Sequence, residues 1–398
     1  MFKSLPFSLS HITAGFVAVL VGFTSSAVIV FQAATTAGAS APEIRSWLFA
    51  LGMSMAFTCI GLSLVYRMPI LTGWSTPGAA LLVTSLSGLS MPEAIGVFFF
   101  ASILTLLSGV TGFFERIIVH IPRALTSAML AGILLHFGMN VFVAMQHQLL
   151  LVASMLVTYL LGKRFFSRYV IIMVLLVGIA MASLLGLFHM QHVHFAWSTP
   201  IFMMPVFSLS ALVSVGIPLF IVTMTSQTIP GLAVMNASGY QPSISPIISW
   251  TGLANAVFAP FGCYSMSLAA ITAAICSGKA ADPNPDQRYK ATLFAGFFWF
   301  LIALFGGTVV SLFFAFPNEF IVAIAGIAMI GTMGSSLHLA LAEESQREPA
   351  IMTILVSASG FTLFGVGSAF WGLLAGILAS LLLNWNREAR VVVEQKLA

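Results

Sequence analysis

The chain has 398 residues, of which 59% are hydrophobic and only 7% are charged, and its mean hydropathy is +1.05. Because about a quarter of the residues in a soluble domain are charged, this composition excludes a soluble globular fold. The net charge of +4 comes from 15 basic residues that form no cluster, which disfavours nucleic acid as a partner and indicates an effect of membrane topology.

Apolar runs of about 20 residues, long enough to cross about 30 Å of hydrocarbon, recur along the whole chain. They predict an all-α polytopic membrane protein with about 14 transmembrane spans. The first run is too long for the apolar part of a signal peptide, so we interpret it as a retained span. The expected spans are 11–33, 46–64, 70–87, 92–114, 123–143, 147–162, 169–188, 208–231, 243–258, 261–278, 290–315, 318–340, 350–363 and 366–384.

Basic residues are unevenly distributed between the two sides of these spans. Every Lys and Arg except Arg45 falls on one side. The positive-inside rule then places both termini in the cytoplasm, with the chain in the bacterial inner membrane. The longest outer loop holds three histidines that either bind a metal or, as we prefer, are solvated: His189, His192 and His194.

The cysteines give no sign of a metal centre or a disulfide framework. Cys59, Cys263 and Cys276 lie in apolar runs and form no CxxC pair. We interpret them as packing residues and expect neither a metal nor a cofactor.

The two halves of the chain share short sequence matches in the same order. Residues 21–26 resemble 222–227, residues 73–80 resemble 263–270, and residues 131–133 resemble 325–327. Many carriers consist of inverted repeats that meet at a midplane site. Since each half is expected to hold seven spans, an odd number, the halves should form inverted seven-span repeats.

The third and tenth spans carry prolines, glycines and hydroxyl residues at membrane depth, in segments 68–78 and 259–267. We expect each to begin extended and to end helical. Thr76 is expected to cap the first helix ahead of Pro77, and Ser265 or Ser267 to cap the second. Helix N-termini facing the midplane would favour an anion. The alternative is that these residues only kink two packed helices.

Three side chains near these breaks are candidate ligand contacts. Trp74 and Tyr264 either lie against a flat apolar ring of the substrate or pack in the core. Gln227 belongs to a polar patch in the eighth span and either contacts the ligand or makes an interhelical hydrogen bond.

All 11 acidic residues fall in loops or at the ends of spans. A carboxylate at the midplane would repel an anion strongly, so this pattern favours an anion over a cation or metal as substrate. It also disfavours a membrane enzyme that binds magnesium through acidic clusters. Proton coupling usually needs an ionisable group along the path. His136 is the best candidate, and its alternative role is a hydrogen-bonded packing residue. Glu93, Glu115 and Glu319 are weaker candidates.

The run 223–242, together with residues 269–276, resembles the benzoate/proton symporter (BenE) family. That family is similar in fold to the uracil/proton symporters and the sulfate-type anion permeases, which implies short strands from spans 3 and 10 that cross at the substrate. The resemblance implies a core domain (1–114 and 208–315), a gate domain (115–207 and 316–384) and a cytoplasmic tail (385–398).

Carried over by position, the resemblance places these residues at the substrate: Trp74, Ser75, Thr76, Gly78, Gln227, Tyr264, Ser265, Met266 and Ser267. The carboxylates that nucleobase carriers use in spans 8 and 10 are missing here, so a nucleobase is disfavoured.

These observations predict a secondary active transporter, not an enzyme, that imports a small aromatic carboxylate such as benzoate together with protons. The expected partners are a small organic anion, protons and the lipid bilayer, with no nucleic acid and with a homodimer as a possible assembly. The alternatives are a passive or channel-like anion permease of the same fold, a nucleobase carrier, and a membrane enzyme or assembly factor without transport activity.

Overall fold

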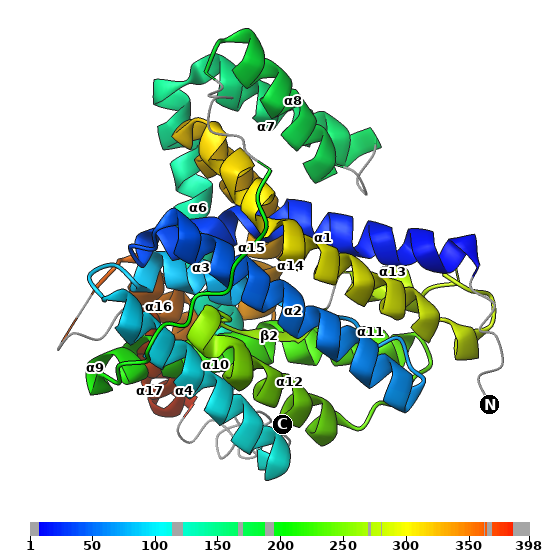
Figure 1. The fold of residues 1–398 in the computed structure, drawn as a ribbon. Helices are drawn as coiled ribbons and strands as arrows, with labels where there is room; N and C mark the ends of the chain where they lie inside the picture. Colours follow the sequence, from blue (N-terminus) through cyan, green and yellow to red (C-terminus); the bar gives the residue numbers. More distant parts are fainter. Residues whose placement is uncertain are drawn as a thin grey trace.

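The computed structural model describes residues 8–113, 122–165, 170–187, 195–269, 272–279, 281–361, 363 and 368–384, and these residues are mostly helical (Figure 1). The elements of the first half are α1 (Leu9–Thr36), α2 (Ala41–Tyr66), β1 (Thr72–Trp74), α3 (Thr76–Ser85), α4 (Met91–Val110), α6 (Arg123–His147), α7 (Leu149–Phe165) and α8 (Val170–Leu184).

The second half begins with α9 (Leu209–Ala211), α10 (Ile217–Thr223), α11 (Ile229–Ala237), α12 (Ile244–Phe258), β2 (Met266–Leu268) and α13 (Ala273–Ser277). It continues with α14 (Tyr289–Ala315), α15 (Asn318–Leu341), α16 (Arg347–Ala358) and α17 (Ser368–Asn384). Most of these bounds lie close to those of the expected spans.

Within the described ranges, 7 helices are long and apolar enough to cross a membrane, and α1 would be an eighth. Helix α1 bends by 43° between Thr24 and Ser26. The hydroxyls of these two residues donate to the carbonyls of Leu20 and Gly22, at 2.7 and 2.9 Å, and such bonds bend helices. The helical membrane architecture is thus confirmed, whereas the 14 spans and the inverted repeat stay predictions.

The predicted eighth span is one helical rod, 209–236, that contains two π-turns. Each π-turn, Leu212–Gly216 and Met224–Thr228, ends two residues before a proline, Pro218 or Pro230. Proline has no N–H and its ring clashes with the carbonyl four residues back, so a wider turn lets the helix continue past it. The second π-turn contains Gln227 and therefore shapes the candidate site.

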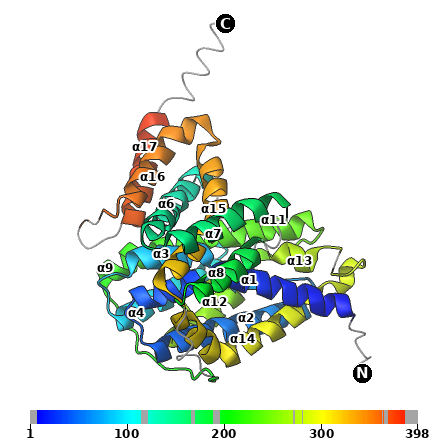
Figure 2. The same ribbon diagram turned by 90° about the horizontal axis from the view of Figure 1, so that it is seen from above.

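The helices pack in two groups. In one, α2 packs along α14, α12 along α4, and α1 against both α14 and α3. In the other, α6 packs against α15 and α16, α16 against α17, and α7 against α8. Figure 2 shows α6, α15, α16 and α17 gathered at one side of the molecule, and in Figure 1 α7 and α8 stand at the top. The first group surrounds the two strands.

Helices α2 and α4 begin at capping boxes, in which a serine at the N-cap is paired with a glutamate three residues later. Glu43 accepts hydrogen bonds from the backbone N–H and hydroxyl of Ser40, and Glu93 does the same for Ser90 at 2.9 and 2.7 Å. Such pairs satisfy N–H groups that the helix itself leaves free. The contacts of Glu93 therefore give it a structural role, although its proposed part in proton coupling stays a prediction.

Gly262 lies at the end of a short 3₁₀ turn, Ala259–Phe261, with φ at +103°. A Cβ at this position would overlap the ring of Trp47, which is fully buried against Phe98 with ring centroids 5.0 Å apart. Only glycine satisfies both the backbone and the space, because left-handed backbone is costly for other residues. This turn brings the chain from α12 to β2.

We predict that Gly262→Ala lowers the thermal unfolding temperature in detergent and destabilises the protein by about 2–4 kcal/mol, since backbone strain and overpacking add. Gly88→Ala is the matched control, because Gly88 also has a positive φ of +87° but no heavy atom within 4 Å of the added Cβ. Equal losses in the two variants would contradict the steric part of this explanation.

Candidate functional site

Strands β1 and β2 form a two-stranded antiparallel ribbon between the third and tenth predicted spans. Thr72 pairs with Leu268, Gly73 with Ser267 and Trp74 with Met266. Two further backbone bonds extend the ribbon, from Ser75 to Ser265 at 3.0 Å and from Ala269 to Leu71 at 2.9 Å. The prediction of extended segments in both spans is confirmed.

The outer edge of β2 is satisfied by one side chain of α12. The amide of Asn255 donates to the carbonyl of Met266 at 2.9 Å and accepts from the N–H of the same residue at 3.1 Å. Asn255 is buried, with 1% of its surface exposed. A side-chain amide thus takes the place that a third strand would occupy.

The outer edge of β1 is satisfied by side chains of α2. The N–H of Thr72 donates to Cys59 Sγ at 3.2 Å, and the Thr72 and Thr58 hydroxyls are 2.7 Å apart. The hydroxyl of Ser63 donates to the carbonyl of Ile70 at 3.3 Å. Cys59 therefore packs as expected, and the sides of the ribbon are closed by protein.

A chain of hydroxyls joins the ribbon to the eighth span. Thr223 donates to Ser75 Oγ at 2.9 Å and lies 3.1 Å from the hydroxyl of Ser265, which donates to it. Thr228 and Ser267 are hydrogen-bonded one turn further on. The Tyr264 hydroxyl donates to the carbonyl of Ser75 at 3.0 Å. The serines expected at the site are thus brought together, and their hydroxyls are engaged within the protein.

Helix α3 begins directly at the end of β1, and the cap differs from the prediction. Ser75, not Thr76, is the N-cap, and its Oγ accepts from the N–H of Gly78 at 3.1 Å. Ser75 holds the extended conformation that pairs with Ser265, and the helix starts directly after it, one residue earlier than a cap at Thr76 would place it. Thr76 is consequently the first helical residue.

The expected cap at the tenth span is also wrong. Ser267 lies in β2 and Ser265 precedes it, whereas helix α13 begins at Ala273 and has only 5 residues. The backbone of Ala269 still bonds to Leu71, so no helix begins at Ser265 or Ser267. The two broken spans are therefore unequal, and among the described elements α3 is the one that offers a helix N-terminus at the ribbon.

The aromatic candidates both pack against protein. Trp74 is 4% exposed, donates from Nε1 to the hydroxyl of Ser26 at 2.7 Å, and meets Trp299 edge-on with centroids 5.0 Å apart. Tyr264 is fully buried beside Trp47 and Phe98, and Met266 is buried as well. These rings form the wall of the ribbon.

Two candidates keep polar groups free. Thr76 and Gln227 are half-buried, and neither side chain has a hydrogen-bond partner among the described residues. Gln227 lies in the second π-turn, next to Thr228 and between the two threonines that bond to the ribbon, Thr223 and Thr228. The interhelical hydrogen bond considered as an alternative for Gln227 is not formed within the described part of the chain.

The ionisable candidates do not gather at the ribbon. His136 is half-buried on α6 and lines a separate cavity beside Thr84; Glu319 lies in the first turn of α15. Glu115 and the loop histidines His189, His192 and His194 lie outside the described residues. Across the described ranges, no group of three His, Cys, Asp or Glu side chains is arranged to hold a metal ion.

Comparison with known proteins identifies the family. A sequence model described as "Benzoate membrane transport protein" matches residues 5–382. The chain belongs to this benzoate transporter family. It is 38% identical over 376 residues to the "Benzoate membrane transport protein" of Acinetobacter baylyi, and 47% identical over 371 residues to the "Inner membrane protein YdcO" of Escherichia coli. These alignments cover 94% and 93% of this chain and 95% of each relative.

Solved structures of anion transporters share the fold of this family member. The transmembrane domain of a cyanobacterial bicarbonate transporter, BicA, matches with a TM-score of 0.58 at 11% identity, covering 94% of this chain and 96% of that one. SLC26A9 matches with a TM-score of 0.62 at 14% identity, covering 94% of this chain and 65% of that one. These likenesses show the fold, whereas the family match identifies the chain as a membrane transport protein and not an enzyme.

Sequence reasoning missed several residues of this transporter's ribbon. Thr223, Asn255 and Ser26 hold the strands and Trp74 in place, yet none of them is among the predicted site residues. A lone amide within an apolar run, as at Asn255, is costly in hydrocarbon and could have been identified by that cost. Nothing in the sequence indicated that Ser26 bonds to Trp74, since small hydroxyl residues are common in membrane helices.

We predict that Asn255→Leu destabilises the transporter strongly, by about 1–3 kcal/mol for each backbone group left without a partner. The side chains are similar in size, so the loss reports the two hydrogen bonds to Met266 and the weaker one that Asn255 accepts from Cys263 Sγ at 3.4 Å. Thermal unfolding of the purified protein in detergent measures it.

Ser249→Ala on the same helix is the control, because the Ser249 hydroxyl bonds only to the carbonyl of Ser245, at 2.8 Å, one turn back. Unfolding of Asn255→Leu at the wild-type temperature would show that the β2 edge does not need this amide.

Proposed function

We propose that this chain is a secondary active transporter that imports a small aromatic carboxylate, with benzoate as the first candidate, together with protons across the inner membrane. The family supports a transporter, and the printed name of the Acinetobacter baylyi relative supports benzoate as substrate. The observation that carries the proposal is the N-terminus of α3, which begins at the ribbon with Thr76 and is joined through the hydrogen bond between Ser75 and Thr223 to the rod that contains Gln227.

The polar character of the ribbon suits a carboxylate. The N-terminal end of α3 carries a partial positive charge and the backbone N–H of Thr76, both of which attract anions, whereas Pro77 has no N–H and the Gly78 N–H is bonded to Ser75. The side chains that contact the strands are hydroxyls, a thiol and an amide, with no acidic group among the described ones. An anion therefore meets donors here and no repelling charge.

The proposed transport cycle moves a core domain (1–114 and 208–315) against a gate domain (115–207 and 316–384). In support, α2, α4, α12 and α14 pack around the ribbon, whereas α6, α15, α16 and α17 pack chiefly on one another. A rigid core carrying the site past a gate would expose it to each side in turn. Cytoplasmic termini, 14 spans in inverted repeats and a homodimer belong to the same proposal.

Proton coupling distinguishes this proposal from a passive anion permease of the same fold. We expect purified protein in liposomes to accumulate labelled benzoate against its concentration gradient when the outside is more acidic. Protein-free liposomes provide the background, because neutral benzoic acid crosses lipid unaided. Saturable benzoate uptake at a rate independent of the imposed pH gradient would favour the passive pathway. Preferential uptake of uracil would favour a nucleobase carrier.

We predict that Gln227→Ala reduces benzoate uptake by at least about tenfold while leaving the protein folded, since a lost hydrogen bond to a charged group weakens binding by that order. Thr225→Ala, in the same π-turn, is the control because the Thr225 hydroxyl bonds back to the carbonyl of Ile221 at 2.8 Å. Normal uptake by Gln227→Ala would remove this side chain from the proposed site.

A further inference from the structure

A cavity of about 660 Å³ lies between the two groups of helices, away from the ribbon. Helices α1 and α3 supply one wall, α6 and the start of α15 the other, and Gly360 after α16 completes it. Its volume falls within the range of sites that hold small molecules, about 300–1,000 Å³. Its residues are Gln32, Thr35, Thr36, Val83, Thr84, His136, Phe137, Asn140, Phe316, Asn318, Ile321, Val322 and Gly360.

Two helices connect this cavity to the ribbon. Thr84 follows Thr76 on α3 by eight residues, which is about 12 Å along a helix. Gln32 follows Ser26, the partner of Trp74, by six residues on α1, or about 9 Å. With the proposed orientation, these helix ends lie at the periplasmic side, so the cavity stands where substrate would arrive.

The cavity holds polar side chains without protein partners. His136 and Asn140 lie one turn apart on α6, Gln32 faces the cavity from α1 and Asn318 from α15. Among the described residues, none of these four side chains forms a hydrogen bond. The threonines differ, because the hydroxyls of Thr35, Thr36 and Thr84 donate to carbonyls of their own helices. Gln32 and His136 are half-buried and Asn140 and Asn318 are exposed, so the cavity opens to the surface and its polar groups can bind a ligand or ordered water.

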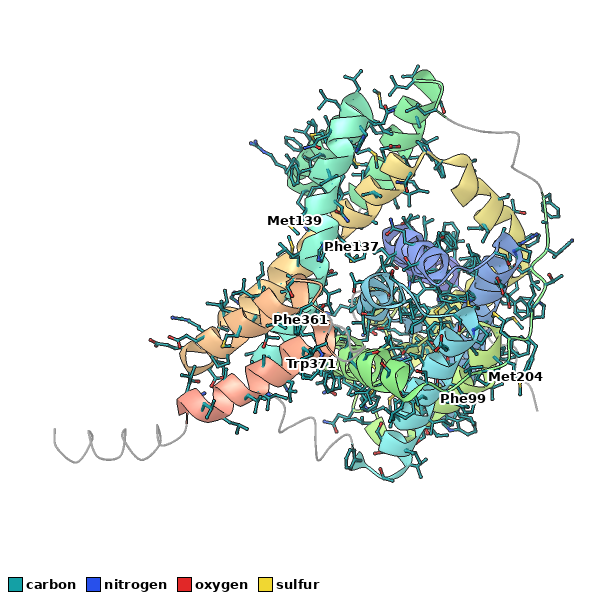
Figure 3. The ribbon with its side chains drawn as sticks, turned by 90° about the vertical axis from the view of Figure 1, so that its left-hand side faces the viewer. Phe99, Phe137, Met139, Met204, Phe361 and Trp371 are labelled. Atoms are coloured by element: carbon teal, nitrogen blue, oxygen red, sulfur yellow. The ribbon has the colours of Figure 1, made fainter. Side chains whose placement is uncertain are left out.

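The rest of the lining is apolar and carries no full charge. Phe137, Phe316 and Ile321 provide flat and branched surface beside the polar groups. In Figure 3, Phe137 lies where α6 runs beside the neighbouring helix group. His136 is the one titratable side chain in the described lining: α1 contributes an amide and two hydroxyls, α3 a hydroxyl and α15 an amide. Such a cavity suits an aromatic ring with one anionic end.

We propose that this cavity is a first binding site for the aromatic carboxylate, in which protonated His136 pairs with the carboxylate and Gln32 and Asn140 donate to it. This inference rests on the proposed function and adds a second site to it. Imidazole is the side chain that most readily gains a proton near neutral pH. Proton and anion then enter as a neutral pair, which costs less to move toward the ribbon than either charge alone.

The test compares His136→Gln with wild type in benzoate uptake by proteoliposomes and in calorimetric binding of benzoate to the full chain. We expect His136→Gln to raise the KM and the Kd about tenfold. We expect the wild-type Kd for benzoate to rise between about pH 5.5 and about pH 7.5. In His136→Gln this rise should be absent. His147→Gln, at the exposed end of the same helix, is the matched control and should behave as wild type.

Substitutions of Gln32, which lines the opposite wall of the cavity, provide a second test. Gln32→Glu places a carboxylate on α1 and should raise the Kd for benzoate by repulsion, whereas Gln32→Asn keeps an amide and should have a smaller effect. If His136→Gln does not fold, the comparison of Gln32→Glu with Gln32→Asn decides whether the cavity binds benzoate. Wild-type Kd and pH dependence in His136→Gln, or wild-type Kd in Gln32→Glu, would overturn the cavity site while leaving the carrier intact. Wild-type protein that neither binds nor moves benzoate would instead overturn the proposed function.

Discussion

Every backbone N–H and C=O group at membrane depth needs a hydrogen-bond partner, because hydrocarbon supplies none. A two-stranded ribbon has two open edges and would be unstable alone. Here Asn255 bonds to the backbone of Met266 at the edge of β2, and Cys59 and Ser63 bond to the backbone of Thr72 and Ile70 at the edge of β1. The arrangement of α2, α12 and the eighth span around the ribbon follows from this requirement.

The same requirement explains why so few polar groups are left for a substrate. Ser75, Ser265 and Ser267 bond to threonines of the eighth span, and Trp74 bonds to Ser26. What remains beside the ribbon is neutral: a helix N-terminus, a hydroxyl and an amide. A site of this kind can attract a negative charge without presenting a fixed positive one, so the proposed proton coupling needs an ionisable group elsewhere in the chain.

Much of the fold could be predicted from the sequence because hydropathy acts over whole helices. The bounds of α14 and α15 lie within a residue of the expected spans, and proline and glycine at depth identified both broken spans. The caps were wrong because they depend on strand pairing between residues nearly 200 positions apart. Ser75 caps α3 since it is the last residue that pairs with the other strand, which no local pattern contains.

The π-turns of the eighth span give that rod a property that an ordinary α-helix lacks. Each holds one residue more than an α-turn, so tightening either one would turn the two ends of the rod relative to each other by about 100° without unfolding it. Gln227 sits inside the second of them, between Thr223 and Thr228, which bond to the strands. The rod can thus rotate about its own axis at the π-turn that contains Gln227.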